Sequence, residues 1–192
     1  MKNLHIYLFR HGESTYNRDR KFTGFHDPSL TKKGIKQAKT IAKKLKNKRF
    51  QVAIHTRLKR SIQTLNIVLK NHQECKVLKK DDRMIERNYG LLNGTKHQAF
   101  KDKYGEEEFN KIHRSYYVPP PGGESFADVE KRVKPFIRDL IKYMKKNKVG
   151  VAISAHGNSI RLFRKLMEKA SIKETCKWAI PYDKVFHYTI KV

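Results

Sequence analysis

Two short apolar segments, far apart in the chain, end in the same dipeptide, and this pairing constrains the fold more than any other feature. The segment Leu4–Phe9 runs through Arg10 into His11-Gly12, and the segment Val149–Ser154 runs into His156-Gly157. Short apolar runs that alternate with helical periodicity predict an α/β fold, here a three-layer α/β/α sandwich with a mostly parallel central sheet. Because ligands bind beyond the carboxyl ends of such strands, both histidines should face one crevice.

Further strands are expected at Val52–His55 and Lys184–Ile190, with a weaker candidate at Cys75–Leu78. The sequence contains no internal repeat, low-complexity segment or linker. A chain of 192 residues is long enough to bury a substantial core without disulfides or metals. We therefore expect a single domain over residues 1–192.

Three helices follow from apolar residues at helical spacing. One begins after Thr31, a candidate N-cap, and should bury Ile35, Ala38, Ala42 and Leu45. A second follows the strand at Val52–His55, with its apolar face over residues 58–69. A longer one starts near Ser125 and reaches about residue 144, with a kink near Lys134 because Pro135 lies inside it.

The residues after the two histidines suggest an anion site. Each histidine is followed by a glycine, which permits a tight turn and a close approach of ligand to backbone. The pattern of residues predicts a helix from Glu13 and another from Asn158 onward, so their free amide groups should point toward an anion. A single His-Gly pair is more often an ordinary buried histidine, but two such pairs at two strand ends favour a shared site.

The net charge of +26, from 44 Lys and Arg against 18 Asp and Glu, is compatible with nucleic acid, an anionic surface or a small anionic substrate. The lysines are scattered over several helices and no nucleic-acid-binding signature occurs, so a lysine-biased surface is the simpler interpretation. No apolar stretch approaches the ~20 residues of a membrane span, and no signal sequence is evident. We expect a cytoplasmic protein with no membrane partner, in which Cys75 and Cys176 are reduced thiols.

Beyond these local patterns, the segment Arg10-His11-Gly12-Glu13 resembles the signature of the histidine phosphatase superfamily. Matching segments follow in the family's order across nearly the whole chain: Asn17, Phe22-Thr23-Gly24, Leu30–Gly34, Thr56–Thr64, Ile85–Gly90 and Ala155–Ser159. The resemblance implies a phosphoglycerate mutase-like fold and a phosphoryl-transfer enzyme that needs no metal.

The roles that this resemblance implies agree with the chemistry of the residues. His11 would be the nucleophile that becomes phosphorylated, since a neutral imidazole is competent near pH 7. Arg10, Arg60 and His156 would neutralise the charge that spreads over the phosphoryl oxygens, and Asn17 would donate a further hydrogen bond. Glu86 would act as the general acid and, on the return step, as the base.

Within the superfamily, the chain is most similar to the cofactor-dependent phosphoglycerate mutases. Glu86-Arg87-Asn88-Tyr89-Gly90, Lys103-Tyr104-Gly105, His113-Arg114-Ser115 and Val118–Pro121 follow that family's order. The similarity implies 2,3-bisphosphoglycerate as a phosphoryl-donating primer. It also implies a set of substrate-binding residues: Asn17, Thr23, Gly24, Tyr89, His97, His113, Arg114, Gly157 and Asn158.

The chain departs from those mutases at three places. His113 precedes Arg114 where the mutases carry paired arginines, and His97 occupies the position of a substrate-contacting lysine, with Lys96 offset by one. The longer lid segment that the familiar mutases insert after Pro121 is missing. Easier entry of water should then raise hydrolysis of the phosphohistidine.

Three functions therefore stay open at this stage. The first is a phosphoglycerate mutase acting on 3-phosphoglycerate and 2-phosphoglycerate. The second is a phosphohistidine-dependent phosphatase for small phosphorylated metabolites. The third, an inactive nucleic-acid or anionic-surface binding protein on the same fold, is disfavoured by the intact set Arg10, His11, Arg60, Glu86 and His156. The sequence leaves open whether the chain forms a homo-oligomer.

Overall fold

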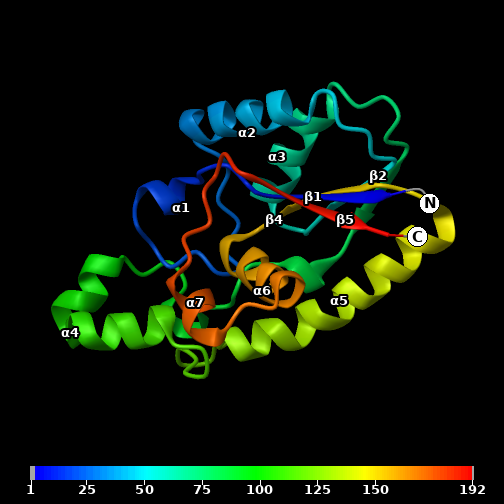
Figure 1. Cartoon of the computed structure of the whole chain (residues 1–192). Helices are drawn as coiled ribbons and strands as arrows, with labels where there is room; N and C mark the ends of the chain where they lie inside the picture. Colours follow the sequence, from blue (N-terminus) through cyan, green and yellow to red (C-terminus); the bar gives the residue numbers. More distant parts are fainter. Residues whose placement is uncertain (1–2, 192) are drawn as a thin grey trace.

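The computed structural model describes residues 3–191, and its centre is a five-stranded sheet (Figure 1). The strand order is β3-β2-β4-β1-β5, and the first four strands are parallel while β5 runs antiparallel to β1 at one edge. The strands are β1 (Leu4–Arg10), β2 (Val52–His55), β3 (Val77–Lys80), β4 (Val151–Ala155) and β5 (Val185–Ile190). The expected mixed α/β fold with a mostly parallel sheet is confirmed.

Strands β1 and β4 are neighbours although some 140 residues separate them in the chain. Their register pairs Phe9 with Ser154 and Arg10 with Ala155. The pairing continues one step beyond β1, because the amide of His11 donates to the carbonyl of Ala155 at 3.0 Å. Both histidines therefore leave the sheet at the same edge, as the two His-Gly endings predicted.

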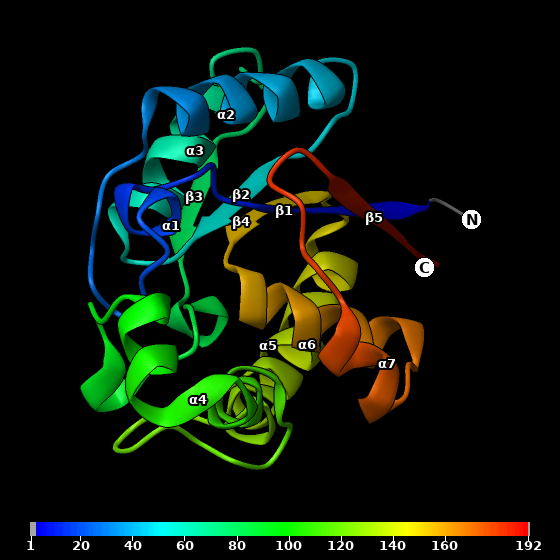
Figure 2. The same cartoon turned by 90° about the vertical axis from the view of Figure 1, so that its left-hand side faces the viewer.

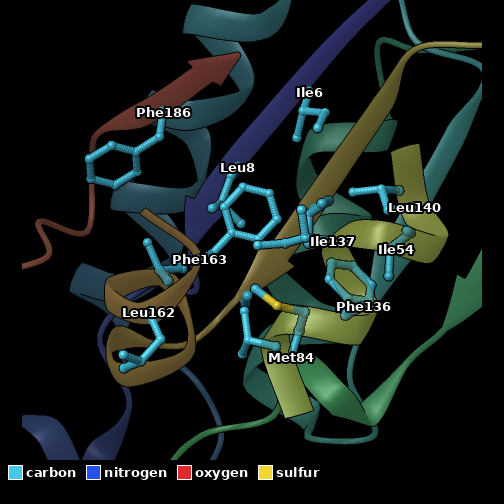
Figure 3. Close-up of a cluster of buried hydrophobic side chains, with 14 of the residues drawn as sticks. Ile6, Leu8, Ile54, Met84, Phe136, Ile137, Leu140, Leu162, Phe163 and Phe186 are labelled. Carbon is cyan, nitrogen blue, oxygen red and sulfur yellow. The ribbon is translucent and has the colours of Figure 1, made fainter. Parts of the chain in front are cut away.

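Two helical layers enclose the sheet. Helices α2 (Lys32–Leu45) and α3 (Lys59–Leu69) cover one face, and α5 (Phe126–Asn147) and α6 (Gly157–Glu168) cover the other (Figure 1). Each face has its own apolar core. Figure 3 shows the larger one, in which Phe136 and Ile137 from α5 and Phe163 from α6 pack against Leu8 of β1. Burial of these side chains fixes the two central strands between rigid helices.

The remaining elements gather around the carboxyl ends of the parallel strands (Figure 2). They are α1 (Thr15–Arg18), α4 (His97–Arg114), α7 (Ile172–Lys177) and the 3-10 turns η1 (Asp82–Met84) and η2 (Gly90–Leu92). Helix α4 was not expected from the sequence, because its residues are only weakly amphipathic and Gly105, with φ of 86°, interrupts the helical backbone. Of this group, α1 and α4 supply residues that line the cavity described below.

Several expectations are corrected in detail. Ile35 is 39% exposed, because Gly34 takes the inward position at the start of α2. The weak strand expected at Cys75–Leu78 lies at Val77–Lys80. Helix α5 continues through Pro135 as one 22-residue element.

Cys75 and Cys176 are free thiols, so no disulfide joins them. Within residues 3–191, no helix combines the length and the apolar character that crossing a bilayer requires.

Candidate active site

His11 lies at the end of β1 with its imidazole fixed in one orientation. Nδ1 lies 2.6 Å from the carbonyl oxygen of Gly12, so this nitrogen must carry the proton and donate it. Nε2 therefore has a free lone pair, which accepts a hydrogen bond from Nε of Arg60 at 3.3 Å. The unprotonated nitrogen is the one available to attack an electrophile.

The surroundings of His11 keep its imidazole neutral. Burial lowers the pKa of His11 well below its usual value, and the positive charges of Arg60 and Arg10 lower it further. A neutral imidazole retains its lone pair at every pH near neutrality. The arrangement suits nucleophilic attack on a group that brings negative charge to the two guanidinium groups.

Arg60 is fully buried on the first turn of α3 and is held by backbone carbonyls. Nη1 donates to the carbonyl of His26 at 2.7 Å and Nη2 donates to the carbonyl of Gly24 at 2.9 Å. Burial lowers the pKa of Arg60 to about 10, which still leaves it charged at neutral pH. Gly24, expected to bind substrate, holds Arg60 through its carbonyl group.

His156 ends β4 and lies beside His11, with ring centroids 5.0 Å apart. Its Nε2 is 2.7 Å from Oγ1 of Thr56, which is itself fully buried. Burial lowers the pKa of His156 well below its usual value, and the charge of Arg60 adds to this effect. The two histidines share one pocket, as the two strand ends predicted.

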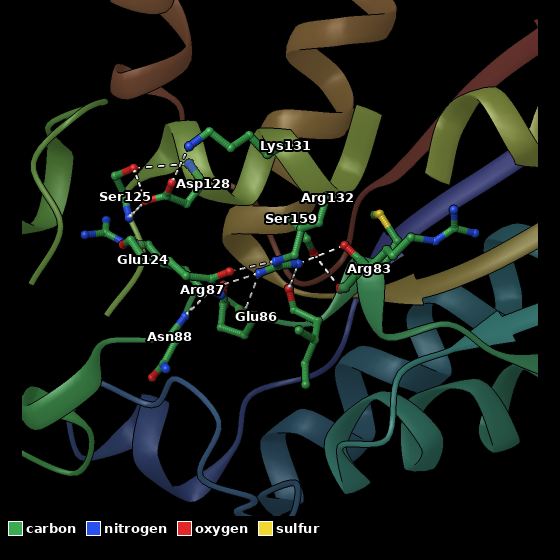
Figure 4. Close-up of polar contacts among 12 residues, drawn as sticks. Arg83, Glu86, Arg87, Asn88, Glu124, Ser125, Asp128, Lys131, Arg132 and Ser159 are labelled. Carbon is green, nitrogen blue, oxygen red and sulfur yellow. Dashed lines mark hydrogen bonds and ion pairs between the residues drawn. The ribbon is translucent and has the colours of Figure 1, made fainter. Parts of the chain in front are cut away.

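Glu86 approaches the same place from the segment between η1 and η2. Its Oε1 accepts hydrogen bonds from the backbone amides of Arg87 at 2.8 Å and Asn158 at 3.1 Å, which orients the carboxylate. Figure 4 shows how Arg132 of α5 holds this segment. Its guanidinium donates to the carbonyls of Arg83, Ile85 and Glu86 and pairs with the carboxylate of Glu124.

A cavity of about 390 Å³ opens over these groups. Ten of the residues expected from the sequence line it: Arg10, Asn17, Thr23, Glu86, Tyr89, His97, His113, Arg114, Gly157 and Asn158. Three more, His11, Arg60 and His156, are buried beside it, each at most 1% exposed. Gly24 does not line the cavity but accepts a hydrogen bond from Arg60. The structure thus brings all the expected residues to one site.

Several cavity residues were missed by sequence reasoning. Arg161 lies one helical turn after Asn158 on α6; it donates to the Asn158 side chain and to the carbonyl of Trp178. Tyr182 stacks against Arg10, whose Cζ lies 4.0 Å from the ring centroid. Helical spacing could have indicated Arg161, but Tyr182 belongs to an irregular segment that gives no sequence signal.

Two expectations about the strand ends are wrong. The chain does not enter a helix at Glu13. Helix α1 begins only at Thr15 and has four residues. A Cβ on Gly12 would lie 2.2 Å from the carbonyl oxygen of Gly34, so packing against α2 requires this glycine rather than the approach of a ligand. Helix α6 does begin directly after His156, but the amide of Asn158 is bonded to Glu86.

Comparison with known proteins places this geometry in a family. The family model described as the histidine phosphatase superfamily (branch 1) matches residues 6–191. The chain belongs to this family. The paired histidines and the arginines of the site agree with the name of the family. The match supports the assignment of the chain as an enzyme of this superfamily.

The curated relatives of the chain share one name. A protein of Nitrobacter winogradskyi named 2,3-bisphosphoglycerate-dependent phosphoglycerate mutase is 37% identical over 170 residues, which is 86% of this chain and 82% of that protein. One of the same name from Bifidobacterium longum is 33% identical over 201 residues, covering 92% of this chain and 82% of its own length.

The chain shares its fold with solved structures that are named as a mutase and as phosphatases. A phosphoglycerate mutase from Bacillus anthracis aligns with a TM-score of 0.80 at 21% identity, covering 99% of this chain and 89% of that one. A putative alpha-ribazole-5'-P phosphatase from Escherichia coli aligns with a TM-score of 0.84 at 20% identity, covering 98% and 91%. At such identities the likeness shows the fold alone.

Proposed function

We propose that this chain is a phosphoglycerate mutase that interconverts 3-phosphoglycerate and 2-phosphoglycerate through a phosphohistidine at His11. The observation that carries the proposal is the distribution of positive charge in one cavity. Arg10 and Arg60 lie at His11, while Arg114 and Arg161 line the same cavity beside Tyr89 and Asn158. A substrate with an anionic group at each end matches this distribution. The names of the curated relatives agree with it.

Unpartnered nitrogens favour a doubly anionic ligand. Within residues 3–191, Nε of Arg10 and Nε of Arg161 are buried and have no hydrogen-bond partner. Buried donors of this kind are costly unless a ligand satisfies them. The cavity therefore fits 2,3-bisphosphoglycerate as well as the monophosphates, and when bound this primer supplies the phosphoryl group that first loads the enzyme.

In the proposed reaction, Nε2 of His11 forms a bond to phosphorus as the bond from phosphorus to the substrate oxygen breaks. Arg10, Arg60 and His156 neutralise the equatorial oxygens, and Asn17 donates a further hydrogen bond. Glu86 gives a proton to the leaving oxygen and takes one from the acceptor hydroxyl on return. Thr23, Gly157 and the far-wall residues Tyr89, His97, His113, Arg114 and Asn158 position the substrate.

A phosphatase is the second candidate, and one feature favours it. Only residues 115–125 join α4 to α5, and none of them lines the cavity. Water that reaches the phosphohistidine would complete hydrolysis in place of transfer to a second hydroxyl. Structural neighbours named as phosphatases are consistent with this alternative.

One assay separates the two functions. Wild-type protein, primed with 2,3-bisphosphoglycerate, is incubated with 3-phosphoglycerate while 2-phosphoglycerate and free phosphate are measured together. We expect 2-phosphoglycerate to form faster than phosphate. Faster release of phosphate would contradict the proposed mutase function and support the phosphatase function.

The covalent step has its own test. The variant His11→Ala should lose both activities by several orders of magnitude, since no other group replaces the nucleophile. The matched control is His187→Ala, which changes a histidine on β5 outside the cavity. Turnover by folded His11→Ala protein near that of the control would contradict the proposal.

A further inference from the structure

Two histidines, His97 and His113, face the cavity from opposite ends of α4. They are 16 positions apart, which in a straight helix would separate them by about 24 Å. The break at Gly105 turns the chain back on itself, so that the two rings lie with centroids only 5.6 Å apart. Both line the cavity, and neither imidazole makes a hydrogen bond within residues 3–191. A pair of imidazoles with free nitrogens is thus held on one wall.

Aromatic rings fix the position of both imidazoles. His97 packs on Phe22 with centroids 4.5 Å apart, and His113 stacks on Phe109 at 5.0 Å with an angle of 18° between planes. Tyr89 lies parallel to His113 on another side, at 6.4 Å. These contacts leave each imidazole little freedom to turn away. The faces of aromatic rings also stabilise an imidazolium, once one forms.

The charges that face this pair are positive in the absence of a ligand. Burial lowers the pKa of His97 to about 4, and the charges of Lys101 and Arg20 add to the effect. Burial lowers the pKa of His113 to about 3, with further contributions from Arg114, His97, Arg161 and Arg87. Lys21 also lines the cavity, and Glu86 is the one carboxylate among the described residues that line it. Both imidazoles are therefore neutral in the ligand-free protein near pH 7.

We propose that His97 and His113 form a proton-coupled anion site, which takes up a proton when the non-reacting anionic end of the substrate binds and so gains the positive charge that grips it. This inference rests on the proposed function for the identity of the ligand, a phosphorylated hydroxy acid with a second anionic group. A fixed arginine or lysine at either position would bind the same group without any proton.

The sign of the effect follows from linkage. A bound anion favours the charged imidazole, so it raises the pKa of each histidine toward neutrality, and binding consumes protons between the free and bound values. In that range the affinity rises as pH falls, by at most tenfold per pH unit for each proton taken up. The kcat should be unaffected by this coupling, because neither imidazole lies at His11.

The proton count can be measured directly. Calorimetric titration of the wild-type protein with 3-phosphoglycerate near pH 7, in two buffers with different ionisation enthalpies, gives the number of protons bound with the ligand. The same titration is made with the double variant His97→Gln/His113→Gln. Protons that the ligand itself gains or loses contribute to both titrations, so they cancel in the difference between the two proteins. We expect the wild type to take up roughly half a proton or more beyond the double variant. His187→Gln, a histidine outside the cavity, should match the wild type.

Equal proton counts in the wild type and the double variant would overturn the proposal. If the double variant does not fold, His113→Arg serves the same purpose: the ratio of wild-type KM to variant KM should rise with pH between about 6 and 8, while the ratio of kcat values stays flat. A KM ratio independent of pH would then refute it.

The test is separable from that of the proposed function. Binding and proton uptake do not require isomerisation, so a chain that hydrolyses 3-phosphoglycerate would still show the difference between wild type and variant. Glycerol 3-phosphate, which lacks the carboxylate, should give the same proton count with both proteins. An equal uptake difference with glycerol 3-phosphate would mean that the pair responds to the phosphate at His11, which contradicts the proposed placement.

Discussion

At the scale of single residues, Thr56 contacts the imidazole of His156. Its hydroxyl lies 2.7 Å from Nε2 of His156 and also accepts a weak hydrogen bond from the amide of Leu58 at 3.4 Å. Both side chains are fully buried, so no water can substitute for this contact. Thr56 thus fixes the orientation of an imidazole that we place at the phosphoryl group.

The variant Thr56→Val keeps the shape of the side chain and removes the hydroxyl. We expect kcat to fall by about tenfold with little change in KM, because His156 loses its orientation while the far wall is intact. Thr175→Val, which removes an equally buried hydroxyl on α7, is the control. Unchanged kcat in folded Thr56→Val protein would show that His156 needs no such support.

The sequence predicted most of the residues that the structure brings together here, for a physical reason. His11, Arg10 and His156 lie at strand ends, where the direction of the backbone alone determines the edge that they face. Thr56 also follows a strand, but a threonine there carries no distinctive chemistry. Tyr182 reaches Arg10 through an irregular segment whose path depends on the packing of the whole chain.

At the scale of elements, α5 does more than cover the sheet. Arg132, with 19% of its side chain exposed, donates to three backbone carbonyls of the segment that carries Glu86. The helix begins at a capping box between Ser125 and Asp128, so its first turns are well defined. The position of the carboxylate is therefore determined by a helix on the far side of the site.

Replacing Arg132 should separate this positioning from simple stability. We expect Arg132→Met to lower kcat by about tenfold or more and to cost about 2 kcal/mol of unfolding free energy, because three partly buried carbonyls lose their donor. Arg138→Met, on the same helix with a side chain that is 75% exposed, should leave both unchanged. Denaturant unfolding and initial rates measure the two effects. A variant that is destabilised but fully active would contradict a positioning role.

Elements were predictable where an apolar stripe was present and unpredictable where other forces dominated. Helices α2, α3 and α5 follow such stripes. Helix α4 does not; it carries Gly105 at positive φ, and aromatic contacts of His97 with Phe22 and of His113 with Tyr89 stabilise its fold-back. The latter contacts link distant segments, so no local pattern could have revealed them.

At the scale of the whole molecule, the net charge of +26 acts on any anionic substrate before contact. The lysines are distributed over the surface; on α2, for example, no acidic residue interrupts them. Such a field raises the rate of encounter with a negatively charged molecule and is screened by salt over distances of about 10 Å.

Added salt should therefore lower kcat/KM more than kcat. Between about 0.02 M and 0.3 M NaCl we expect kcat/KM for 3-phosphoglycerate to fall by roughly threefold or more. The variant Lys142→Gln/Lys145→Gln/Lys146→Gln removes charge near the end of α5, away from the cavity, and should reduce this salt dependence (Figure 1). If kcat/KM of the variant depends on salt as that of the wild type does, then the effect comes from charges in the cavity alone.

The pairing of β1 with β4 has a consequence for how a newly made molecule becomes active. His11 leaves the ribosome 145 residues before His156 and 171 residues before Tyr182, whose rings both lie beside its own. A nascent chain that stops before these two residues lacks part of the pocket, so we expect it to show no turnover. Recovery of turnover during refolding would accordingly report the joining of the two ends of the chain.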